Sequence, residues 1–187
     1  MRQNIPIDFE KLRSNYPHRT SKEGQFGGKL GHKDLREFMS HTPGTPCCVQ
    51  VSHSFNMAGH YIPQTYEGGR RFNSPIKING RVHYYILAVD EMEKYLTQQY
   101  GAGELVSHDE SNKRRNYLQV QSYLKGRTGL LVMRDSTPGV HTEFWDGSSF
   151  LQKDVAVKHL LELPRVLFWD CTLAPPQWLE DFVGPQP

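Results

Sequence analysis

Residues 45–59 read TPCCVQVSHSFNMAG, and this stretch decides the fold. Thr45 can cap a helix and Pro46 suits its first position, so the pattern predicts a helix that begins at Cys47. Gly59 closes the helix, because glycine is favoured just beyond a helix end. Apolar residues recur at intervals of three and four and predict one buried face, made of Cys48, Val51, Phe55 and Ala58.

Cys47 is the candidate nucleophile. A cysteine in the first turn of a helix lies near the positive end of the helix dipole and near free N–H groups. Both stabilise the thiolate, which is the reactive form of the side chain. Cys48 falls on the apolar face and is better explained as core. The alternative is that both cysteines are small buried hydrophobes, and the residues alone leave both interpretations open.

His141 is the candidate base among nine histidines. It lies within VHTEFW, residues 140–145, which alternate as a strand and place Glu143 and Trp145 on the same side as His141. A strand holds an imidazole firmly, as a general base requires. The alternative is a structural histidine held by hydrogen bonds.

Two other histidines are nearer to Cys47 in sequence but are poorly placed. His53 lies on the same predicted helix, almost two turns away, so its ring cannot easily reach the cysteine. His60 lies beyond the end of that helix.

The base needs a partner that orients its second nitrogen. Asp146-Gly147 indicates a hairpin, with residues 149–155 as the return strand. A two-residue loop places Gln152 opposite His141, whereas a four-residue loop places Asp154 there. An aspartate stabilises imidazolium better than a glutamine, although a glutamine can fix the tautomer.

The remaining pattern predicts helices before an antiparallel sheet, which is the α+β class. Asp8 can cap a first helix, and Asp90 with Glu93 suggests a capping box for a third. The segment 103–117 contains HDESNKRRN and suggests a solvated loop or the start of a helix. The expected helices cover 9–15 and 90–100, and the expected strands cover 82–89, 129–134, 140–145, 149–155 and 165–170.

Composition bounds the functional class. A chain of 187 residues suits a single domain, here 1–187, and a net charge of +2 is too small to indicate nucleic-acid binding. The first residues lack the apolar region of a signal peptide, and no apolar run is long enough to insert into a membrane. Three cysteines without a C-x-x-C motif predict no thiolate metal site, and no cofactor motif is present.

Several segments together resemble the fourth subfamily of type VI secretion amidase effectors, which are NlpC-type, papain-like cysteine peptidases. Cys47, Ser52, Asn56 and Gly59 fall in register with the Cys, Ser, Asn and Gly of the family's nucleophile helix. The other similar segments are FGGKLG at 26–31, YYILAVDEMEKYLT at 84–97, LKGRTGLLVM at 124–133 and HTEFWDG at 141–147.

The resemblance implies a nucleophile helix packed on an antiparallel sheet and cleavage of the γ-D-glutamyl–meso-diaminopimelate bond of peptidoglycan stem peptides. It also implies delivery by a secretion apparatus from the producer's cytoplasm to the periplasm of a target bacterium, and an immunity protein as partner. The family places its third catalytic residue, an aspartate, at the offset of Gln152. Asp154 is the nearest aspartate, and we favour it because a carboxylate stabilises imidazolium.

Two other functions fit the same residues. An NlpC-type fold can also support an acyltransferase or a deamidase that acts on proteins. A non-enzymatic interaction domain would use Cys47 only for packing.

Overall fold

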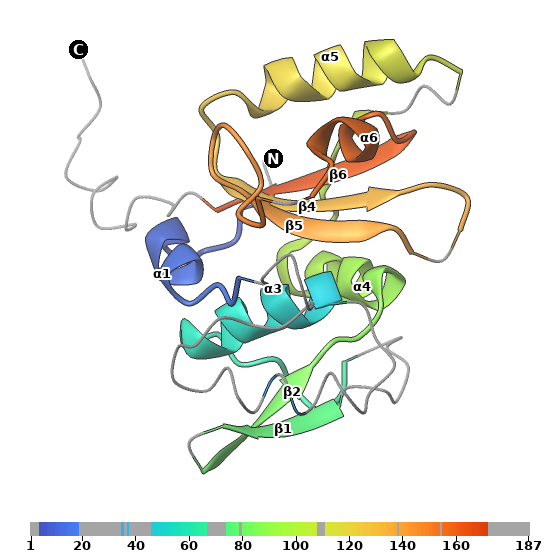
Figure 1. The fold of residues 1–187 in the computed structure, drawn as a ribbon. Helices are drawn as coiled ribbons and strands as arrows, with labels where there is room; N and C mark the ends of the chain where they lie inside the picture. Colours follow the sequence, from blue (N-terminus) through green and yellow to red (C-terminus); the bar gives the residue numbers. More distant parts are fainter. Residues whose placement is uncertain are drawn as a thin grey trace, which may run out of the picture.

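The computed structural model describes residues 4–18, 35, 37, 46–66, 74–78, 80–107, 111–137, 139–153 and 155–171. A four-stranded sheet lies at its centre, with helices on both faces and a separate hairpin beyond one helix layer (Figure 1). None of the described helices is long and apolar enough to cross a membrane.

The central sheet is antiparallel with the strand order β3-β6-β4-β5. Its strands are β3 (Glu104–Ser107), β4 (Gly129–Arg134), β5 (His141–Trp145) and β6 (Arg165–Asp170). The sequence of β4 is apolar without alternation because both faces of this strand are covered. β5 is at the edge of the sheet, so one side of it is open to contacts from outside the sheet.

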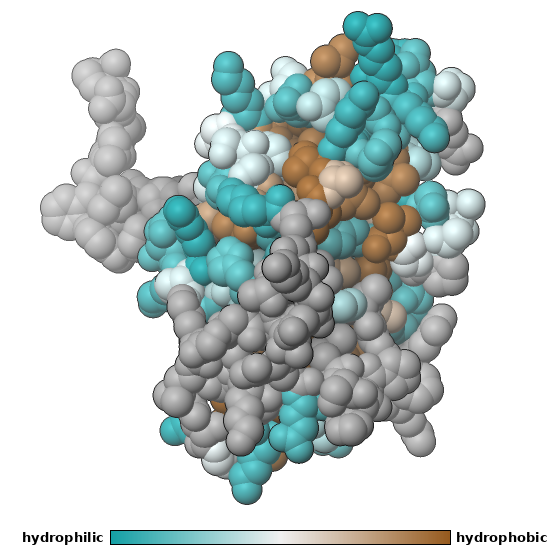
Figure 2. Space-filling model, viewed as in Figure 1, coloured by the Kyte–Doolittle hydropathy of each residue, from teal (hydrophilic) through white to brown (hydrophobic). Residues whose placement is uncertain are grey.

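Helices α5 (Lys113–Leu124) and α6 (Val157–Leu161) cover one face of the sheet, and their apolar residues join Leu131 and Phe168 in one core cluster. Helices α1 (Phe9–Ser14), α3 (Pro46–Met57) and α4 (Val89–Tyr100) cover the other face (Figure 1). In the face shown in Figure 2, hydrophobic residues lie at the level of the sheet and the surface over α5 is mostly hydrophilic.

Helix α3 lies between the central sheet and a hairpin of β1 (Ser74–Ile78) and β2 (Arg81–Tyr85) (Figure 1). It is therefore buried on both sides, including its polar residues from Gln50 to Asn56. These polar side chains form hydrogen bonds, as burial requires. The hydroxyl of Ser52 accepts from the N–H of Ile86 at 3.1 Å, so the helix is fixed to the chain that follows β2.

Most of the expected elements are confirmed. The helix expected to begin at Cys47 is α3, which ends at Met57 and is followed by Gly59 with φ of +89°, a conformation that glycine adopts without strain. Asp8 caps α1 by accepting a hydrogen bond from the N–H of Glu10 at 2.9 Å. The strands at 129–134 and 165–170 have the expected bounds, and helix α4 ends before Gly101 as expected.

Two expected strands differ from the structure. The segment 149–155 is not a return strand, because a single bridge between Trp145 and Phe150 is followed by bends and a turn. The expected strand at 82–89 runs instead from Arg81 to Tyr85. In the segment 103–117, the expected helix start is present as the first turn of α5, but the strand β3 before it was not expected.

The expected capping box at the start of α4 was also wrong. Ala88 is the N-terminal cap of this helix and makes no side-chain hydrogen bond, so Asp90 and Glu93 do not form a capping box. Glu93 instead accepts hydrogen bonds from Arg134 at 3.1 Å and Arg165 at 2.6 Å. These contacts join α4 to the ends of β4 and β6. They give Glu93 a structural role other than helix capping.

Candidate active site

Cys47 is the second residue of α3, where the free N–H groups of the first turn lie. The residue is only 4% exposed, and its thiol is in contact with the side chains of Cys48 and His141. A hydrogen bond from Cys48 holds the pKa of Cys47 well below its usual value, and the contact with His141 adds to this effect. Burial acts in the opposite direction but is outweighed. The site therefore favours a thiolate.

His141 opens the edge strand β5 and faces the N-terminus of α3. Burial lowers the pKa of the imidazole, but its interactions with Cys47 and Glu143 outweigh that effect and raise the pKa to about 9. The ring also packs near Phe150, with ring centroids 6.0 Å apart. The structure thus brings the two expected residues together, and the lowered pKa of Cys47 and the raised pKa of His141 both favour a thiolate paired with an imidazolium.

Glu143 lies two residues after His141 on β5 and is fully buried. Its Oε2 atom is 3.7 Å from Nε2 of His141 and accepts a hydrogen bond of 2.7 Å from the hydroxyl of Tyr16. Its Oε1 atom accepts from the N–H of Phe144 at 2.9 Å. The pKa of Glu143 is raised, because the effect of burial outweighs the stabilisation of the ionised form by His141, Tyr16 and the N–H of Phe144.

Gln152 is buried, while Asp154 lies outside the described residues. The amide of Gln50 donates to Oε1 of Gln152 at 2.9 Å. The loop before Gln152 has four residues, Asp146 to Ser149, since the N–H of Asp146 donates to the carbonyl of Ser149 at 3.0 Å. The longer of the two expected loops is therefore present, although no paired strand follows it to define the residue opposite His141.

The carboxylate of Asp146 holds this loop in shape. It accepts hydrogen bonds from the N–H groups of Ser148 at 3.0 Å and Ser149 at 2.8 Å. Burial alone would raise the pKa of Asp146, but these bonds outweigh it and lower the pKa to about 2. The loop geometry is thus fixed by a side chain that the sequence had marked only as a turn residue.

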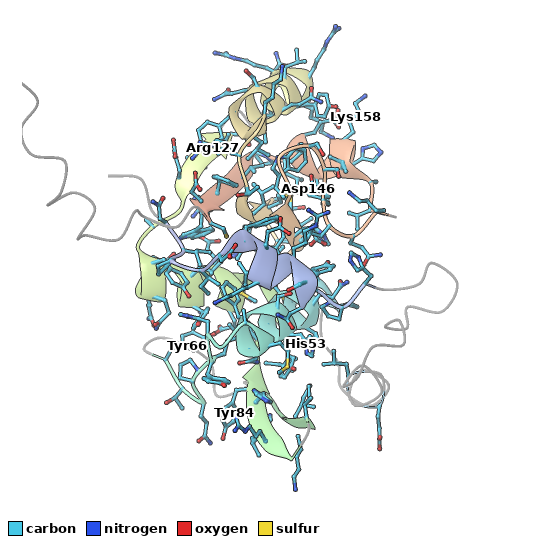
Figure 3. All side chains as sticks on the ribbon, turned by 90° about the vertical axis from the view of Figure 1, so that its left-hand side faces the viewer. His53, Tyr66, Tyr84, Arg127, Asp146 and Lys158 are labelled. Atoms are coloured by element: carbon cyan, nitrogen blue, oxygen red, sulfur yellow. The ribbon has the colours of Figure 1, made fainter. Side chains whose placement is uncertain are left out.

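The structure places the two other histidines away from the thiol. His53 lies on the side of α3 that faces the β1–β2 hairpin, where its Nδ1 atom is 2.9 Å from the hydroxyl of Tyr85 (Figure 3). His60 follows the end of the helix and contacts Tyr100. Neither histidine replaces His141 in the contact with Cys47.

The other cysteines are part of the core. Cys48 and Cys171 are buried thiols that form no disulfide within the described residues, and both belong to the cluster between the sheet and α3. Burial raises the pKa of the Cys171 thiol, so this residue is held as a neutral thiol. In the described ranges, no group of three or more His, Cys, Asp or Glu side chains is arranged to bind a metal ion.

Two residues of the site were not assigned a role from the sequence. The sequence pattern does point to Glu143, because strand alternation puts residue i+2 on the same side as His141. No sequence pattern points to Tyr16, since it precedes Glu143 by 127 residues and the contact depends on how α1 packs on β5.

A comparison with protein families finds a match that covers most of the chain. The model of the family described as type VI secretion system (T6SS), amidase effector protein 4, matches residues 44–169. This range contains both Cys47 and His141. No curated protein sequence matches the chain.

Among solved structures, the effector of the Tae4–Tai4 effector–immunity system from Salmonella typhimurium has a TM-score of 0.61 and 19% identity. The match covers 90% of this chain and all of that one. The type VI effector Tae4 from Enterobacter cloacae has a TM-score of 0.60 and 14% identity, over 92% of this chain and all of that one. At these identities the two structures establish the fold, which is the mixed α+β fold of those effectors. The family match goes further, and the chain therefore belongs to the amidase effector protein 4 family of the type VI secretion system, a family of hydrolases.

Proposed function

We propose that this chain kills bacteria by cutting peptidoglycan stem peptides at the γ-D-glutamyl–meso-diaminopimelate bond, with Cys47 as nucleophile and His141 as acid and base. Family membership supports the amidase chemistry and the cell-wall substrate. The single observation that carries the residue assignment is the contact between the Cys47 thiol, in the first turn of α3, and the His141 imidazole.

In the first step, the thiolate of Cys47 attacks the carbonyl carbon of the scissile amide. A C–S bond forms and the carbonyl oxygen becomes an oxyanion, which N–H groups at the start of α3 are placed to stabilise. His141 then gives its proton to the leaving nitrogen of diaminopimelate. The C–N bond breaks and leaves the γ-glutamyl group on Cys47 as a thioester.

In the second step, neutral His141 takes a proton from water, and the hydroxide attacks the thioester. The C–S bond breaks, the thiolate of Cys47 is restored and His141 is again protonated. Each turnover consumes one water and returns the site to the ion pair. A raised pKa of about 9 for His141 keeps the imidazolium available for the next cycle at neutral pH.

The biological setting follows from the family. Family membership supports delivery by the secretion apparatus. We infer that the substrate lies in the periplasm of the target cell. A cognate immunity protein is the expected partner, because solved Tae4 structures from Salmonella and Enterobacter are effector–immunity complexes. That residues 1–187 form one peptidase domain, and that Asp154 or Gln152 orients His141, stay predictions.

Mass spectrometry of muropeptides after digestion of purified sacculi tests the proposal. The wild-type protein should release products with a new γ-glutamyl carboxyl and a free diaminopimelate amine. Cys47→Ala and His141→Ala should give no product, since loss of either group commonly costs several orders of magnitude in rate.

His53→Gln is the matched control, because His53 is also a buried histidine with a hydrogen-bonding neighbour. It should retain cleavage as long as it folds. Cleavage by folded Cys47→Ala would contradict the assignment, and modification of proteins without any cut muropeptide would favour a transferase or deamidase.

A further inference from the structure

We propose that Glu143 orients the imidazole of His141 and stabilises its protonated form, and that Tyr16 holds the Glu143 carboxylate in place. This inference rests on the proposed function, since it assigns a positioning residue to the same site. It gives the role to a side chain on the histidine's own strand and differs from the sequence expectation of Asp154 or Gln152.

The first support is the position of Nε2 of His141. This atom is buried and has no hydrogen-bond partner within the part of the chain that the structure describes. Oε2 of Glu143 lies 3.7 Å away, within ion-pair distance but longer than a hydrogen bond. Catalytic hydrogen bonds are often long in a free enzyme and shorten in the substrate complex, so this gap is compatible with a functional contact.

The second support is that both oxygens of the Glu143 carboxylate accept hydrogen bonds. Tyr16 donates to Oε2 at 2.7 Å and the N–H of Phe144 donates to Oε1 at 2.9 Å. Tyr16 is itself buried against Phe144, with ring centroids 6.1 Å apart, so its phenol is rigidly placed. The carboxylate therefore cannot turn away from His141 without losing two hydrogen bonds.

The third support is the cost of burying this charge. A fully buried carboxylate is unfavourable unless a cation and hydrogen bonds compensate for the lost water. Within the described residues, the cation that pairs with Glu143 is His141. The ion pair with His141 therefore adds to the hydrogen bonds from Tyr16 and Phe144 in compensating for the burial of this carboxylate.

Gln152 is less suited to this role. Its Oε1 atom already accepts a hydrogen bond from Gln50. An amide oxygen can fix a tautomer but carries no net charge, so it stabilises imidazolium less than a carboxylate does.

The decisive measurement is the titration of His141 by NMR in an inactive Cys47→Ala background, with and without Glu143→Gln. His141→Gln in the same background assigns the resonance among the nine histidines. Because a carboxylate within about 4–6 Å raises the pKa of imidazolium, its removal should lower the pKa of His141 by roughly 1–3 units. In the active background, Glu143→Gln should reduce kcat by about 10²-fold or more.

Glu91→Gln is the matched control, since Glu91 is a buried carboxylate that accepts from a tyrosine, Tyr66, at 2.8 Å. It should leave the His141 titration unchanged. If Glu143→Gln fails to fold, Tyr16→Phe replaces it, because it keeps the carboxylate and removes its anchor. A small misplacement of the carboxylate should then reduce kcat by at least about tenfold.

An unchanged His141 titration in folded Glu143→Gln, or wild-type kcat in both variants, would overturn the inference. So would a lowered His141 pKa in Asp154→Asn but not in Glu143→Gln, which would give the role to Asp154. The titration needs no substrate, so it separates a failure of this inference from a failure of the proposed peptidoglycan activity.

Discussion

Gln50 and Gln152 are joined by an amide–amide hydrogen bond of 2.9 Å, at the position where the family resemblance places an aspartate. The Nε2 atom of Gln50 also donates to the carbonyl of Pro17 at 3.0 Å. Both glutamines are buried. The pair therefore ties α3 to the segment after β5 and to the chain that follows α1.

Gln152→Ala should destabilise the protein more than it slows the reaction. It removes the acceptor of a buried amide, and a lost buried hydrogen bond costs about 1–3 kcal/mol of unfolding free energy. Chemical denaturation and kcat on purified stem peptide check this. The reverse pattern, unchanged stability with a rate loss as large as that of Glu143→Gln, would make Gln152 the residue that orients His141.

The reactivity of Cys47 should persist at mildly acidic pH. A lowered pKa keeps this cysteine ionised, and its imidazolium partner persists until the pH approaches the His141 pKa of about 9. An iodoacetamide label at mildly acidic pH should therefore reach Cys47 first, whereas Cys171 is protonated because burial raises the pKa of its thiol. Peptide mapping over time measures this order.

A His141 variant and a comparison of the three cysteines serve as controls for this labelling experiment. His141→Ala should shift the labelling of Cys47 toward higher pH, because the imidazolium no longer stabilises the thiolate. Equal labelling of Cys47, Cys48 and Cys171 in the native protein would contradict the choice of Cys47.

Asn56→Ala should lower stability without touching the chemistry. Asn56 is buried, donates to the carbonyl of Tyr84 at 2.9 Å and accepts from the N–H of Ile62 at 3.0 Å. Its loss leaves two backbone groups without partners, so the free energy of unfolding should fall by about 1–3 kcal/mol. Asn15→Ala, which removes an exposed bond to Lys11, should change it by less than about 0.5 kcal/mol. Equal effects would show that Asn56 does not fasten the helix.

These contacts explain why the nucleophile helix was predictable from sequence. Ser52, Asn56 and Gly59 matched the family register, and each has a local physical reason to be there. Ser52 and Asn56 fasten the helix to its neighbours, and Gly59 ends it. The strands 129–134 and 165–170 were equally clear, because each is buried along nearly its whole length and has an apolar sequence.

Other parts depend on tertiary contacts that leave no clear pattern. Helix α5 buries only Asn116, Val120 and Leu124, so its sequence is dominated by polar residues. From the sequence, the start of this segment could therefore be interpreted either as a solvated loop or as the start of a helix. The return strand was expected from the Asp146-Gly147 hairpin signal. The described chain bonds to β5 only as far as Leu151, whose N–H donates to the carbonyl of Phe144 at 3.0 Å, and α6 follows. The anchoring of Glu143 by Tyr16 required the packing of α1, which sequence spacing does not contain.

Toxicity should depend on the compartment in which the protein is made. Its proposed substrate lies outside the cytoplasmic membrane, so cytoplasmic expression in a test bacterium should be harmless. Expression with an added periplasmic signal peptide should lyse the cells, because the stem peptides are then accessible. Optical density and release of a cytoplasmic enzyme measure lysis.

Cys47→Ala with the same signal peptide is the control, and it should abolish lysis without reducing the amount of exported protein. Cytoplasmic killing that survives Cys47→Ala would require a target other than peptidoglycan. We expect periplasmic lysis to require Cys47, because Cys47 is the proposed nucleophile. Co-expression of a cognate immunity protein should prevent lysis, because solved Tae4 relatives are effector–immunity complexes.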